Sequence, residues 1–499
     1  MGASDSIRED VNRVCAGILD GYKPRLRCPR KIVRDPVVGF EYLEPHEIPI
    51  IDSPIFQRLR RIRQTALAYQ VYPTANHTRF EHCLGVAHRA MQMVDALNQK
   101  RPGFVSEQKA LELRFAGLLH DVGHGPFSHL SETIFGQQFE WQLKALATED
   151  PRFVKKGLGE VLSYFIVTSD AFRALAGSVF EACGVTIDLD TVAGYFIGAA
   201  PTDNDQFLAE IISGSCDADK LDYFERDCYY TGIRAEIDTD RILAVIDIDD
   251  RSPDPKRHLV VHRAGVHHLE QIIFSKMLLY SSVYHHHKIR GLECGVKAVF
   301  REIWKDPSGL VDQRLRFPTI GSVLTFTDEE FWVVARGEPR LKGMVEALAI
   351  GREPPKRALA LSMATVNQEA WKADQALRYQ QLSELPERQL TVARTIQAML
   401  PTELSVFPFG VAFDFPASPK VSLEAKSTIV DRGDEYVPLT DFFPSDEWVS
   451  AYTDNKLTAH VFFDPDDDAR RKVNEVSRSY LREEYGLVCK PIATDMCFK

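Results

Sequence analysis

The sequence predicts a mainly α-helical protein with a smaller α+β lobe at its C-terminal end. Helical periodicity of apolar residues starts near Asp52 and dominates to about residue 400. Before it, residues 31–45 (KIVRDPVVGFEYLEP) alternate and carry proline and glycine, which is typical of two short strands. After about residue 402, the stretches LSVFPFGVAFDF and LTAHVFFDP have the pattern of strands, and residues 469–486 have that of an amphipathic helix.

Length and composition bound the organisation of the chain. Its 499 residues exceed the usual size of one hydrophobic core, and we divide it into an N-terminal segment with short strands (1–47), a helical core (48–400) and an α+β lobe (401–499). The net charge of −11 does not indicate general nucleic-acid binding. Nine cysteines without a CxxC pair predict reduced thiols and a cytoplasmic protein. No apolar run approaches the ~18 residues of a membrane span, so no membrane partner is predicted, and the first residues are expected to be disordered.

Two helices open the core. Asp52 or Ser53 can cap the first, and Pro54 suits its first turn. In residues 78–97 (TRFEHCLGVAHRAMQMVDAL), apolar side chains cover nearly the whole circumference, which predicts a buried helix. His82 lies on this helix, and two interpretations of it remain open: a hydrogen-bonded core histidine, or a metal ligand.

The stretch LLHDVGHGPFSH (118–129) does not have the composition of a packed core. His120 and Asp121 supply an imidazole nitrogen and a carboxylate oxygen, which suit a divalent ion such as Mn, Fe, Zn or Ni. His124 follows four residues after His120, so the two share a face where glycines and a proline end the helix and let a substrate approach closely. The alternative interpretation is a polar helix end capped by histidines.

The stretch SCDADKLDYFERDCYYTG (215–232) offers a fourth ligand. In a helix, Asp219, Tyr223 and Asp227 fall at positions i, i+4 and i+8 and form one continuous face, with Lys220 beside it. A solvated charged face would explain the two acids, but less easily the tyrosine between them.

A later segment repeats the pattern with basic residues. Lys276, Tyr280, Tyr284 and Lys288 occupy positions i, i+4, i+8 and i+12 of a helix. Lysines and phenols on one face suit phosphate and a stacked sugar or base. A half-buried tyrosine stripe with snorkelling lysines is an equally good interpretation.

The order of these residues resembles a known family. His82, then His120-Asp121, then Asp219 is similar to the H…HD…D signature of the HD-domain metal phosphohydrolases. Four stretches resemble the deoxynucleoside triphosphate triphosphohydrolases (dNTPases) more closely: DSPIFQRLRRIRQ (52–64), VYPTANHTRFEHCLGV (71–86), GLLHDVGHGPFSH (117–129) and DADKLDYFERDCYYTGI (217–233). Within that family the resemblance is strongest to the dNTPases that join a SAM domain to an HD domain, although no SAM domain is expected here. It covers residues 30–300 well and the C-terminal lobe more loosely, and it implies an HD-domain helical core.

The resemblance implies a role for each matching residue. The implied metal ligands are His82, His120, Asp121 and Asp219, a set that accepts Mn, Fe, Zn, Ni or Mg. The implied substrate-binding residues are Arg79, Lys220 and Lys276 for the phosphates, Gln64 and Asp227 for the 3′-hydroxyl, Tyr284 under the deoxyribose, and Tyr223 and Tyr280 around it. The implied catalytic residues are His124 and His129, with Glu132 beside them; the histidines would position the attacking water or protonate the leaving 5′-oxygen. The products would be a deoxynucleoside and inorganic triphosphate.

The resemblance also implies regulation by nucleotides. The relatives bind an activating guanine nucleotide at positions that match Asp52, Gln57 and Arg60. Part of a second activator site matches Asp238 and Arg241. Such sites lie between subunits in the family, so a nucleotide-assembled homo-oligomer, a tetramer, is implied. Helix capping is the competing interpretation of Asp52, and Arg34 replaces an asparagine of this surface.

Two departures from the family pattern bear on catalysis. Glu132 stands where the family has aspartate, and Lys156 and Gly157 stand where the family has a histidine–glutamate pair that supports the catalytic histidine. Loss of such outer support would slow hydrolysis, shift the acting histidine or change the substrate.

Three functions therefore compete. The leading hypothesis is a nucleotide-activated dNTPase that lowers dNTP pools, in nucleotide homeostasis or antiviral defence. The first rival is an HD-domain nuclease or a phosphatase on other nucleotides, which would not release inorganic triphosphate. The second is a catalytically weak nucleotide sensor or nucleic-acid-binding scaffold, which would bind dNTPs without turning them over.

Overall fold

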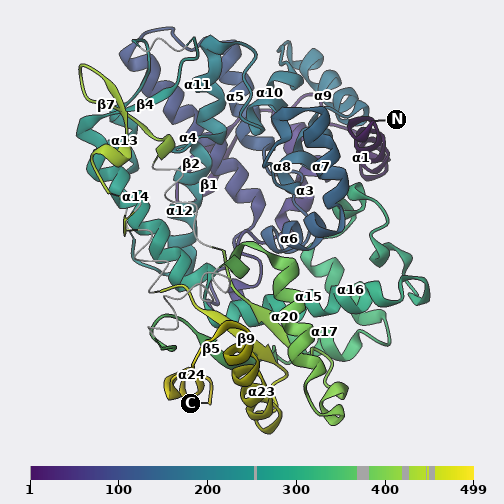
Figure 1. Ribbon diagram of the computed structural model, residues 1–499. Coiled ribbons are helices and arrows are strands. Elements are labelled where there is room, and N and C mark those ends of the chain that lie inside the picture. The colour runs from purple at the N-terminus through teal and green to yellow at the C-terminus, as the bar shows by residue number, and fades with distance from the viewer. Residues whose placement is uncertain are drawn as a thin grey trace. The chain divides into compact units, whose positions relative to one another are not determined.

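A computed structural model describes residues 2–235, 237–251, 255–367, 381–417, 426–444, 447–448 and 456–498 (Figure 1). Contacts within the chain divide it into two compact units. The first comprises residues 1–276, 317–331 and 423–443, and the second comprises residues 277–316, 332–422 and 444–499. Helices dominate and the strands are short, so the predicted mainly α fold with a small α+β part is confirmed.

The first unit is a bundle of helices. They are α1 (Ala3–Leu19), α2 (Ile48–Ile51), α3 (Pro54–Gln57), α4 (Arg79–Lys100), α5 (Glu107–Leu119), α6 (His129–Gln138), α7 (Glu140–Glu149), α8 (Leu158–Val167), α9 (Asp170–Cys183), α10 (Leu189–Phe196), α11 (Gln206–Ser213), α12 (Ala218–Thr231), α13 (Thr239–Val245) and most of α14 (Val266–Leu279). Helix α4 packs against both α5 and α12. These three helices carry the residues predicted to bind metal.

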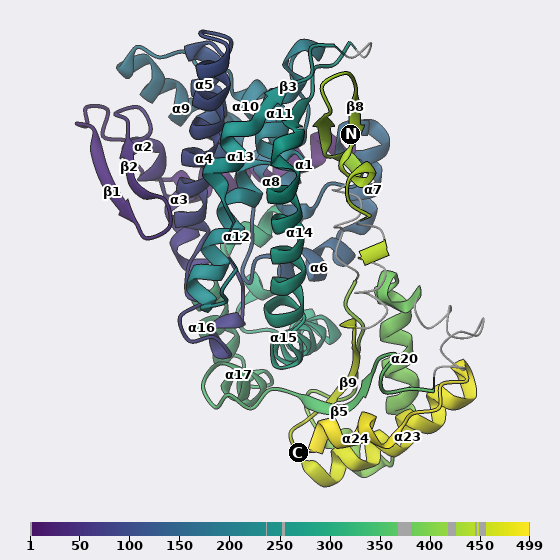
Figure 2. The same cartoon turned by 90° about the vertical axis from the view of Figure 1, so that its left-hand side faces the viewer.

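Two small sheets complete the first unit. Strands β1 (Lys31–Asp35) and β2 (Gly39–Leu43) form an antiparallel hairpin at the edge of this unit (Figure 2). The second sheet has the order β3-β4-β7-β8, from strands β3 (Ile246–Ile248), β4 (Leu259–His262), β7 (Ile429–Asp431) and β8 (Tyr436–Pro438). Its central pair, β4 and β7, is parallel and the other two pairs are antiparallel.

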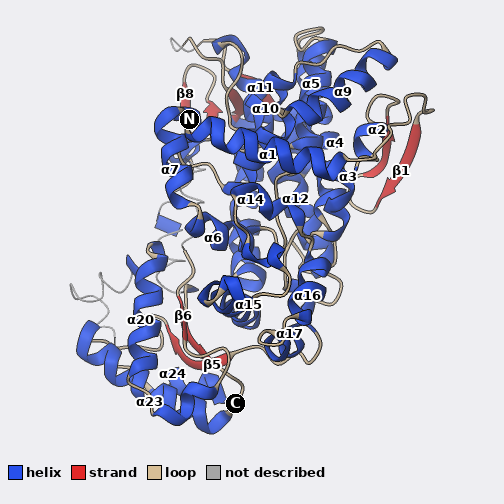
Figure 3. Ribbon diagram, turned by 90° about the vertical axis from the view of Figure 1, so that its right-hand side faces the viewer, coloured by secondary structure: helices blue, strands red, loops and turns tan. Residues whose placement is uncertain are grey.

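The second unit combines helices with a three-stranded antiparallel sheet (Figure 3). Its strands are β5 (Lys356–Leu361), β9 (Ala459–Phe463) and β6 (Ala412–Asp414), in the order β5-β9-β6. Its helices are α15 (His287–Lys305), α17 (Lys342–Ala349), α20 (Pro386–Ala398), α23 (Asp467–Tyr485), α24 (Pro491–Phe498) and the end of α16 (Asp328–Gly337). Apolar residues of all three strands and of α20 and α23 form one buried cluster.

The predicted helix starts are set by local capping. Ser53, not Asp52, caps α3 by accepting a hydrogen bond from the Phe56 N–H. Helix α4 begins with a capping box between Thr78 and Glu81. Helix α12 begins at the N-cap Asp217, whose carboxylate accepts from the Lys220 N–H at 2.7 Å. Each cap fixes the first turn of a helix that carries a site residue.

Some sequence predictions differ from the structure. The first residues form helix α1 rather than a disordered start, because Ile7, Val11 and Cys15 lie one turn apart and are buried on one face. The stretch read as helical to about residue 400 also contains β3, β4 and β5. The three-part domain division stays a prediction, and the compact units do not follow its boundaries. Within the described ranges, no helix has both the length and the apolar character needed to cross a membrane.

Helices α4 and α5 approach so closely that Gly117 has no room for a side chain. A Cβ at this position would lie 2.7 Å from the Cα of Ala87. We expect Gly117→Ala to lower the free energy of unfolding by about 1–3 kcal/mol, because main-chain atoms cannot move aside as a flexible side chain can. Urea unfolding followed by circular dichroism measures this.

The matched control is Gly177→Ala in α9, where a Cβ would meet nothing within 4 Å. That change is expected to be neutral or to stabilise by up to about 1 kcal/mol, through the higher helix propensity of alanine. Equal effects of the two substitutions would contradict the close packing of α4 on α5.

Candidate metal centre

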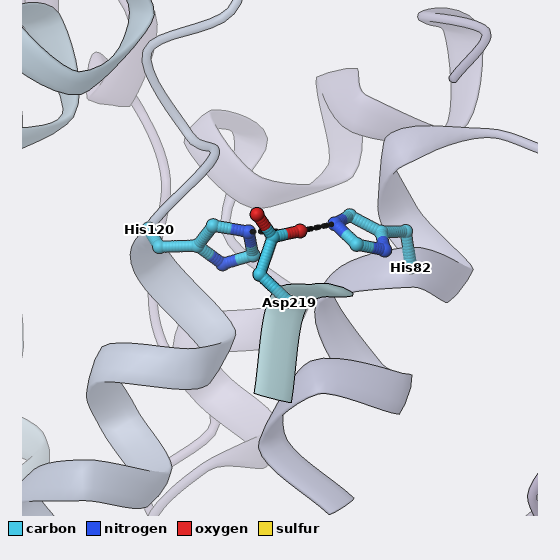
Figure 4. A group of neighbouring side chains, drawn as sticks. All are labelled: His82, His120 and Asp219. Atoms are coloured by element: carbon cyan, nitrogen blue, oxygen red, sulfur yellow. Dashed lines mark ion pairs between the residues drawn. The ribbon is translucent and has the colours of Figure 1, made fainter. Parts of the chain in front are cut away.

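Three helices bring the predicted metal ligands together. His82 lies in the first turns of α4, His120 follows the last residue of α5, and Asp219 lies in the first turn of α12 (Figure 4). The Nε2 atom of His82 lies 3.1 Å from Oδ1 of Asp219, and Nε2 of His120 lies 3.9 Å from the same oxygen. Asp121 completes the group, with carboxylate oxygens 3.5 Å from the Nε2 atoms of both histidines. Side chains from distant parts of the sequence therefore lie together in one place.

Both imidazoles are oriented for ligation by their other nitrogen. Nδ1 of His82 lies 2.8 Å from Oδ2 of Asp222, and Nδ1 of His120 lies 2.8 Å from the carbonyl oxygen of Gly117. The two Nε2 atoms are buried and have no hydrogen-bond partner. Metal-binding histidines have this arrangement, because a carboxylate or carbonyl on one ring nitrogen leaves the other available to the ion. His82, His120, Asp121 and Asp219 therefore fit a divalent cation.

The electrostatics of the site keep its carboxylates charged. Burial opposes ionisation, but the Arg79 guanidinium and the imidazoles of His120 and His124 hold the pKa of Asp121 well below its usual range. Burial also acts against Asp219, yet the adjacent imidazole of His82 lowers its pKa to about 2. Both groups are thus ionised at neutral pH, as metal ligation requires.

A buried charged network stands behind His82. Arg226 donates two hydrogen bonds of 2.8 Å to Asp222 and one of 2.7 Å to Asp35, at the end of β1. Burial would raise the pKa of Asp222, but Arg226 and His82 hold it below the usual range. A Cβ on Gly85 would lie 1.9 Å from Oδ1 of Asp222, so only glycine lets α4 pass over this network. His82 is therefore held by residues that the sequence reading did not single out.

The loop after α5 places His124 next to the metal group. Helix α5 ends at Leu119, so His120 and His124 do not share the face of one helix, and that expectation is wrong because the chain turns immediately after His120. Nε2 of His124 nevertheless lies 3.1 Å from Oδ1 of Asp121. His129 starts α6, and its ring lies 5.3 Å from that of His124. The turn brings together the two histidines predicted to be catalytic.

Glu132 joins this pair to α8. Its Oε2 lies 2.7 Å from Nδ1 of His129, and its Oε1 accepts a hydrogen bond of 2.8 Å from the main-chain N–H of Gly159. Burial acts against the charge of Glu132, but the neighbouring His124 and the hydrogen bond from His129 lower its pKa to about 2. Lys156, at the predicted departure, contacts Glu160 and Ser213 instead. The main chain of Gly159 thus supplies the outer support to Glu132.

Gly159 has no space for a side chain beside the two candidate catalytic groups. A Cβ there would lie 2.7 Å from Oε1 of Glu132 and 2.9 Å from Nε2 of His124. We expect Gly159→Ala to lower kcat by roughly 10–100-fold, the cost usual for displacing outer-shell groups. Steady-state kinetics alongside thermal unfolding measure the effect. The control is Gly136→Ala in α6, at a partly exposed position where a Cβ meets nothing within 4 Å. A loss of stability with unchanged kcat would contradict a role of Gly159 in placing Glu132 and His124 for catalysis.

The residues predicted to bind phosphate differ in their surroundings. Arg79 is buried, hydrogen-bonds Asp121, and donates from Nε to Ser128 Oγ at 3.1 Å. Lys220 is partly buried and donates from Nζ to Asp217 at 2.8 Å and to the Gly214 carbonyl at 2.9 Å. Lys276 is buried near the end of α14. Arg79 directly contacts Asp121, one of the predicted metal ligands.

The predicted 3′-hydroxyl pair is linked through a histidine. The Gln64 N–H donates to the carbonyl of His77 at 3.0 Å, and Nε2 of His77 lies 2.7 Å from Oδ1 of Asp227. Oε1 of Gln64 is buried without a hydrogen-bond partner, and Tyr223 is partly buried one turn before Asp227 on α12. Gln64 and Asp227 therefore share one neighbourhood, with His77 between them.

The tyrosine face takes a different form from the predicted one. Tyr280 and Tyr284 begin and end a π-helical turn, with ring centroids 5.2 Å apart, and α15 starts afresh after the N-cap His286. The predicted continuous face from Lys276 to Lys288 is therefore wrong, because the π turn and the break change the angular spacing of residues. Both tyrosines belong to the second compact unit.

The predicted activator residues lie at the surface of the first unit. Asp52 is exposed, with Lys31 Nζ 3.6 Å from its carboxylate. Gln57 accepts a hydrogen bond of 2.9 Å from Arg60, whose guanidinium lies over the Phe80 ring at 3.4 Å. At the second surface, Asp238 is the N-cap of α13 and accepts from the Arg241 N–H at 2.9 Å. Asp52 is the C-cap of α2 and not the N-cap of α3, so its carboxylate does not cap the helix that was predicted to start there.

Comparison with known proteins identifies an HD domain within the chain. The HD domain family matches residues 79–171, a range that includes His82, His120 and Asp121. The deoxynucleoside triphosphate triphosphohydrolase SAMHD1 of Danio rerio is 32% identical over 273 residues, 52% of this chain and 42% of that protein. The human protein of the same name is 34% identical over 232 residues, 43% of this chain and 35% of that protein. The chain thus spans less than half the length of these curated relatives.

An uncharacterised bacterial protein and two solved structures are also similar to this chain. The uncharacterised protein YwfO of Bacillus subtilis is 30% identical over 319 residues, 63% of each chain. A hypothetical protein of Aquifex aeolicus, solved by crystallography, superposes with a TM-score of 0.62 at 22% identity and covers 90% of this chain and 100% of that one. A phosphohydrolase of Bacteroides thetaiotaomicron superposes with a TM-score of 0.61 at 22% identity, over 87% of this chain and 100% of that one. The match over residues 79–171 shows that this chain contains an HD domain, and the fold brings the H…HD…D side chains of that segment and of α12 together.

Proposed function

We propose that the protein is a metal-dependent dNTP triphosphohydrolase that converts a dNTP and water into a deoxynucleoside and inorganic triphosphate. The observation that carries the proposal is the position of His124, 3.1 Å from Asp121, whose carboxylate lies beside the three side chains His82, His120 and Asp219 that could hold a metal ion. Sequence similarity to dNTPases over about half of the chain supports the choice of substrate. The proposed metal is a divalent ion from the set Mn, Fe, Zn, Ni and Mg.

The proposed roles follow from the surroundings of each residue. A bound divalent ion supplies Lewis-acid polarisation of a phosphoryl oxygen. Water attacks the α-phosphorus, the bond to the 5′-oxygen breaks, and that oxygen takes a proton from His124 or His129. Glu132 holds the His129 ring through Nδ1. Arg79, Lys220 and Lys276 neutralise phosphate charge, while Gln64, Asp227 and the tyrosines Tyr223, Tyr280 and Tyr284 bind the deoxyribose.

We further propose regulation by nucleotides. Asp52, Gln57 and Arg60 form one activator surface, and Asp238 and Arg241 belong to a second. Asp52, Arg60, Asp238 and Arg241 are exposed on the first unit and Gln57 is partly exposed, which supports this assignment. The proposed active form is a homo-oligomer, a tetramer, assembled by activator nucleotides. The nine cysteines are all free thiols, which supports a cytoplasmic setting and a role in control of dNTP pools.

The test is an analysis of reaction products. Metal-loaded protein is incubated with each dNTP alone, with pairs of dNTPs and with added GTP, and the products are resolved by anion-exchange chromatography. The proposal expects deoxynucleoside and inorganic triphosphate in equal amounts from the wild type and neither from Asp219→Asn. Asp95→Asn, an exposed acid on α4, is the matched control and should behave as the wild type.

Other products would identify the rival functions. Monophosphates or shortened oligonucleotides would replace the proposal with a phosphatase or nuclease. Binding of dNTPs without products under every mixture would make the protein a nucleotide sensor, and the altered support around Glu132 and Gly159 would then be the place to seek the cause. Activity independent of GTP and of substrate mixture would remove the proposed activator surfaces.

A further inference from the structure

The loop from Val122 to Ser128, which follows the metal ligand Asp121, has an unfavourable backbone. Phe127 and Ser128 have φ angles of +64° and +51°, the left-handed region that side-chain-bearing residues rarely adopt. Such conformations persist only where the surroundings over-determine them. The groups that hold this loop therefore determine where Asp121 and His124 lie.

Arg58 holds the first half of the loop. It lies in the 3₁₀ turn Arg58–Arg61, which follows α3, and its guanidinium is partly buried. Nη1 donates to the carbonyl oxygen of Val122 at 3.0 Å and Nη2 donates to that of His124 at 2.7 Å. A single planar group thus spans two carbonyls of the loop, a geometry that lysine, with one nitrogen, cannot reproduce.

Asp328 holds the second half. It is the first residue of α16, and its carboxylate is buried with 1% of its surface exposed. Oδ1 accepts a hydrogen bond of 2.7 Å from the Phe127 N–H, and Oδ2 accepts one of 3.0 Å from the Arg63 N–H. Both oxygens are therefore used on main-chain groups, one in the loop and one next to Gln64.

Further hydrogen bonds connect Asp328 to the predicted metal ligands. Ser128 Oγ donates to the Arg63 carbonyl at 2.6 Å and accepts from Arg79 Nε at 3.1 Å. Arg79 in turn hydrogen-bonds Asp121. A continuous series of contacts thus connects Asp328 to a predicted metal ligand through Ser128 and Arg79.

We propose that Arg58 and Asp328 are positioning residues of the metal centre, which hold the loop between them by its main chain and thereby fix Asp121 and His124. Neither side chain has a place in the ligand set or in the proposed substrate pocket. The inference rests on the proposed metal centre but not on the identity of the substrate. Its test can therefore be read without any nucleotide.

The experiment measures Mn²⁺ binding to Arg58→Lys and Asp328→Asn, by electron paramagnetic resonance of free Mn²⁺ in full-length protein. We expect each substitution to raise the Kd roughly 10–100-fold, the usual effect of groups that orient metal ligands. The matched controls are Arg61→Lys, an exposed residue of the same turn, and Glu329→Gln, the exposed neighbour of Asp328, and both should keep the wild-type Kd.

A second measurement separates positioning from general stability. Urea unfolding gives the midpoint of each variant, and Mn²⁺ binding is measured well below it, so that only folded protein is titrated. Lower midpoints with a Kd within about threefold of the wild type would overturn the proposal. If Mn²⁺ binding weakens as expected while the wild type releases no triphosphate, the positioning role stands and the dNTPase proposal falls.

Discussion

Replacing Asp121 with alanine is expected to remove the metal and to lower kcat by at least about 1,000-fold, since a Lewis acid supplies several kcal/mol of transition-state stabilisation. The structure gives the reason for so large an effect. The Asp121 carboxylate lies 3.5 Å from the Nε2 atoms of His82 and His120 and 3.1 Å from that of His124. Its loss also leaves the buried Arg79 without its carboxylate partner. Metal content after dialysis and steady-state turnover measure the two parts of the prediction.

The control for this substitution is Asp95→Ala, which removes an exposed carboxylate from α4 and should leave metal content and kcat at wild-type values. Retention of one metal per chain by Asp121→Ala, with a loss of turnover below tenfold, would contradict the assignment of this aspartate as a ligand. If Asp121→Ala kept its metal but lost turnover, Asp121 would instead act in catalysis through its contact with His124.

Arg226→Met is expected to lower the free energy of unfolding by about 3–5 kcal/mol, the cost of leaving buried carboxylates without their cation. Arg226 is fully buried and pairs with both Asp222 and Asp35. Methionine fills similar space but offers no charge. Because Asp222 also orients His82, metal affinity should fall roughly 10–100-fold. Urea unfolding and Mn²⁺ titration of the same preparation measure the two effects.

A surface ion pair provides the comparison for Arg226. Arg173 and Asp190 are 2.6 Å apart, with side chains 37% and 62% exposed, and Arg173→Met should cost less than about 1 kcal/mol. If the Arg226 variant were no less stable than the Arg173 variant, the buried network would contribute little to folding. Reduced stability with unchanged Mn²⁺ affinity would limit its role to the fold.

The fold is predictable from the sequence where a long element carries its own signal. Residues 79–100 combine a capping pair with apolar side chains around the helix, and α4 forms there. Strand β5 has no such signal, because KRALAL is a short apolar run that periodicity cannot distinguish from a buried helical segment. Strand β4 pairs with β7 across well over a hundred residues, and no local pattern reports such a partner.

The candidate site, too, can be predicted from the sequence only in part. The ligand types and their order along the chain are visible in His82, His120-Asp121 and Asp219. The residues that orient these ligands cannot be identified from the sequence. Arg226 and Asp35 are 191 positions apart, and Asp222 looks like any acidic residue on a helix. His77 lies within a stretch that resembles the dNTPases, but its link to Asp227 depends on how α12 packs. Sequence reasoning therefore finds ligands more readily than the groups that support them.

The packing of the loop from Val122 to Ser128 limits how the protein could be redesigned. A Cβ on Gly123 would lie 2.3 Å from main-chain atoms of α8, and one on Gly125 would lie 2.4 Å from Val323. Libraries that vary these positions would therefore consist mostly of misfolded members. Tyr223, by contrast, is only partly buried on α12. Mutagenesis aimed at a new substrate range is best directed at Tyr223, with the sequence of the loop left unchanged.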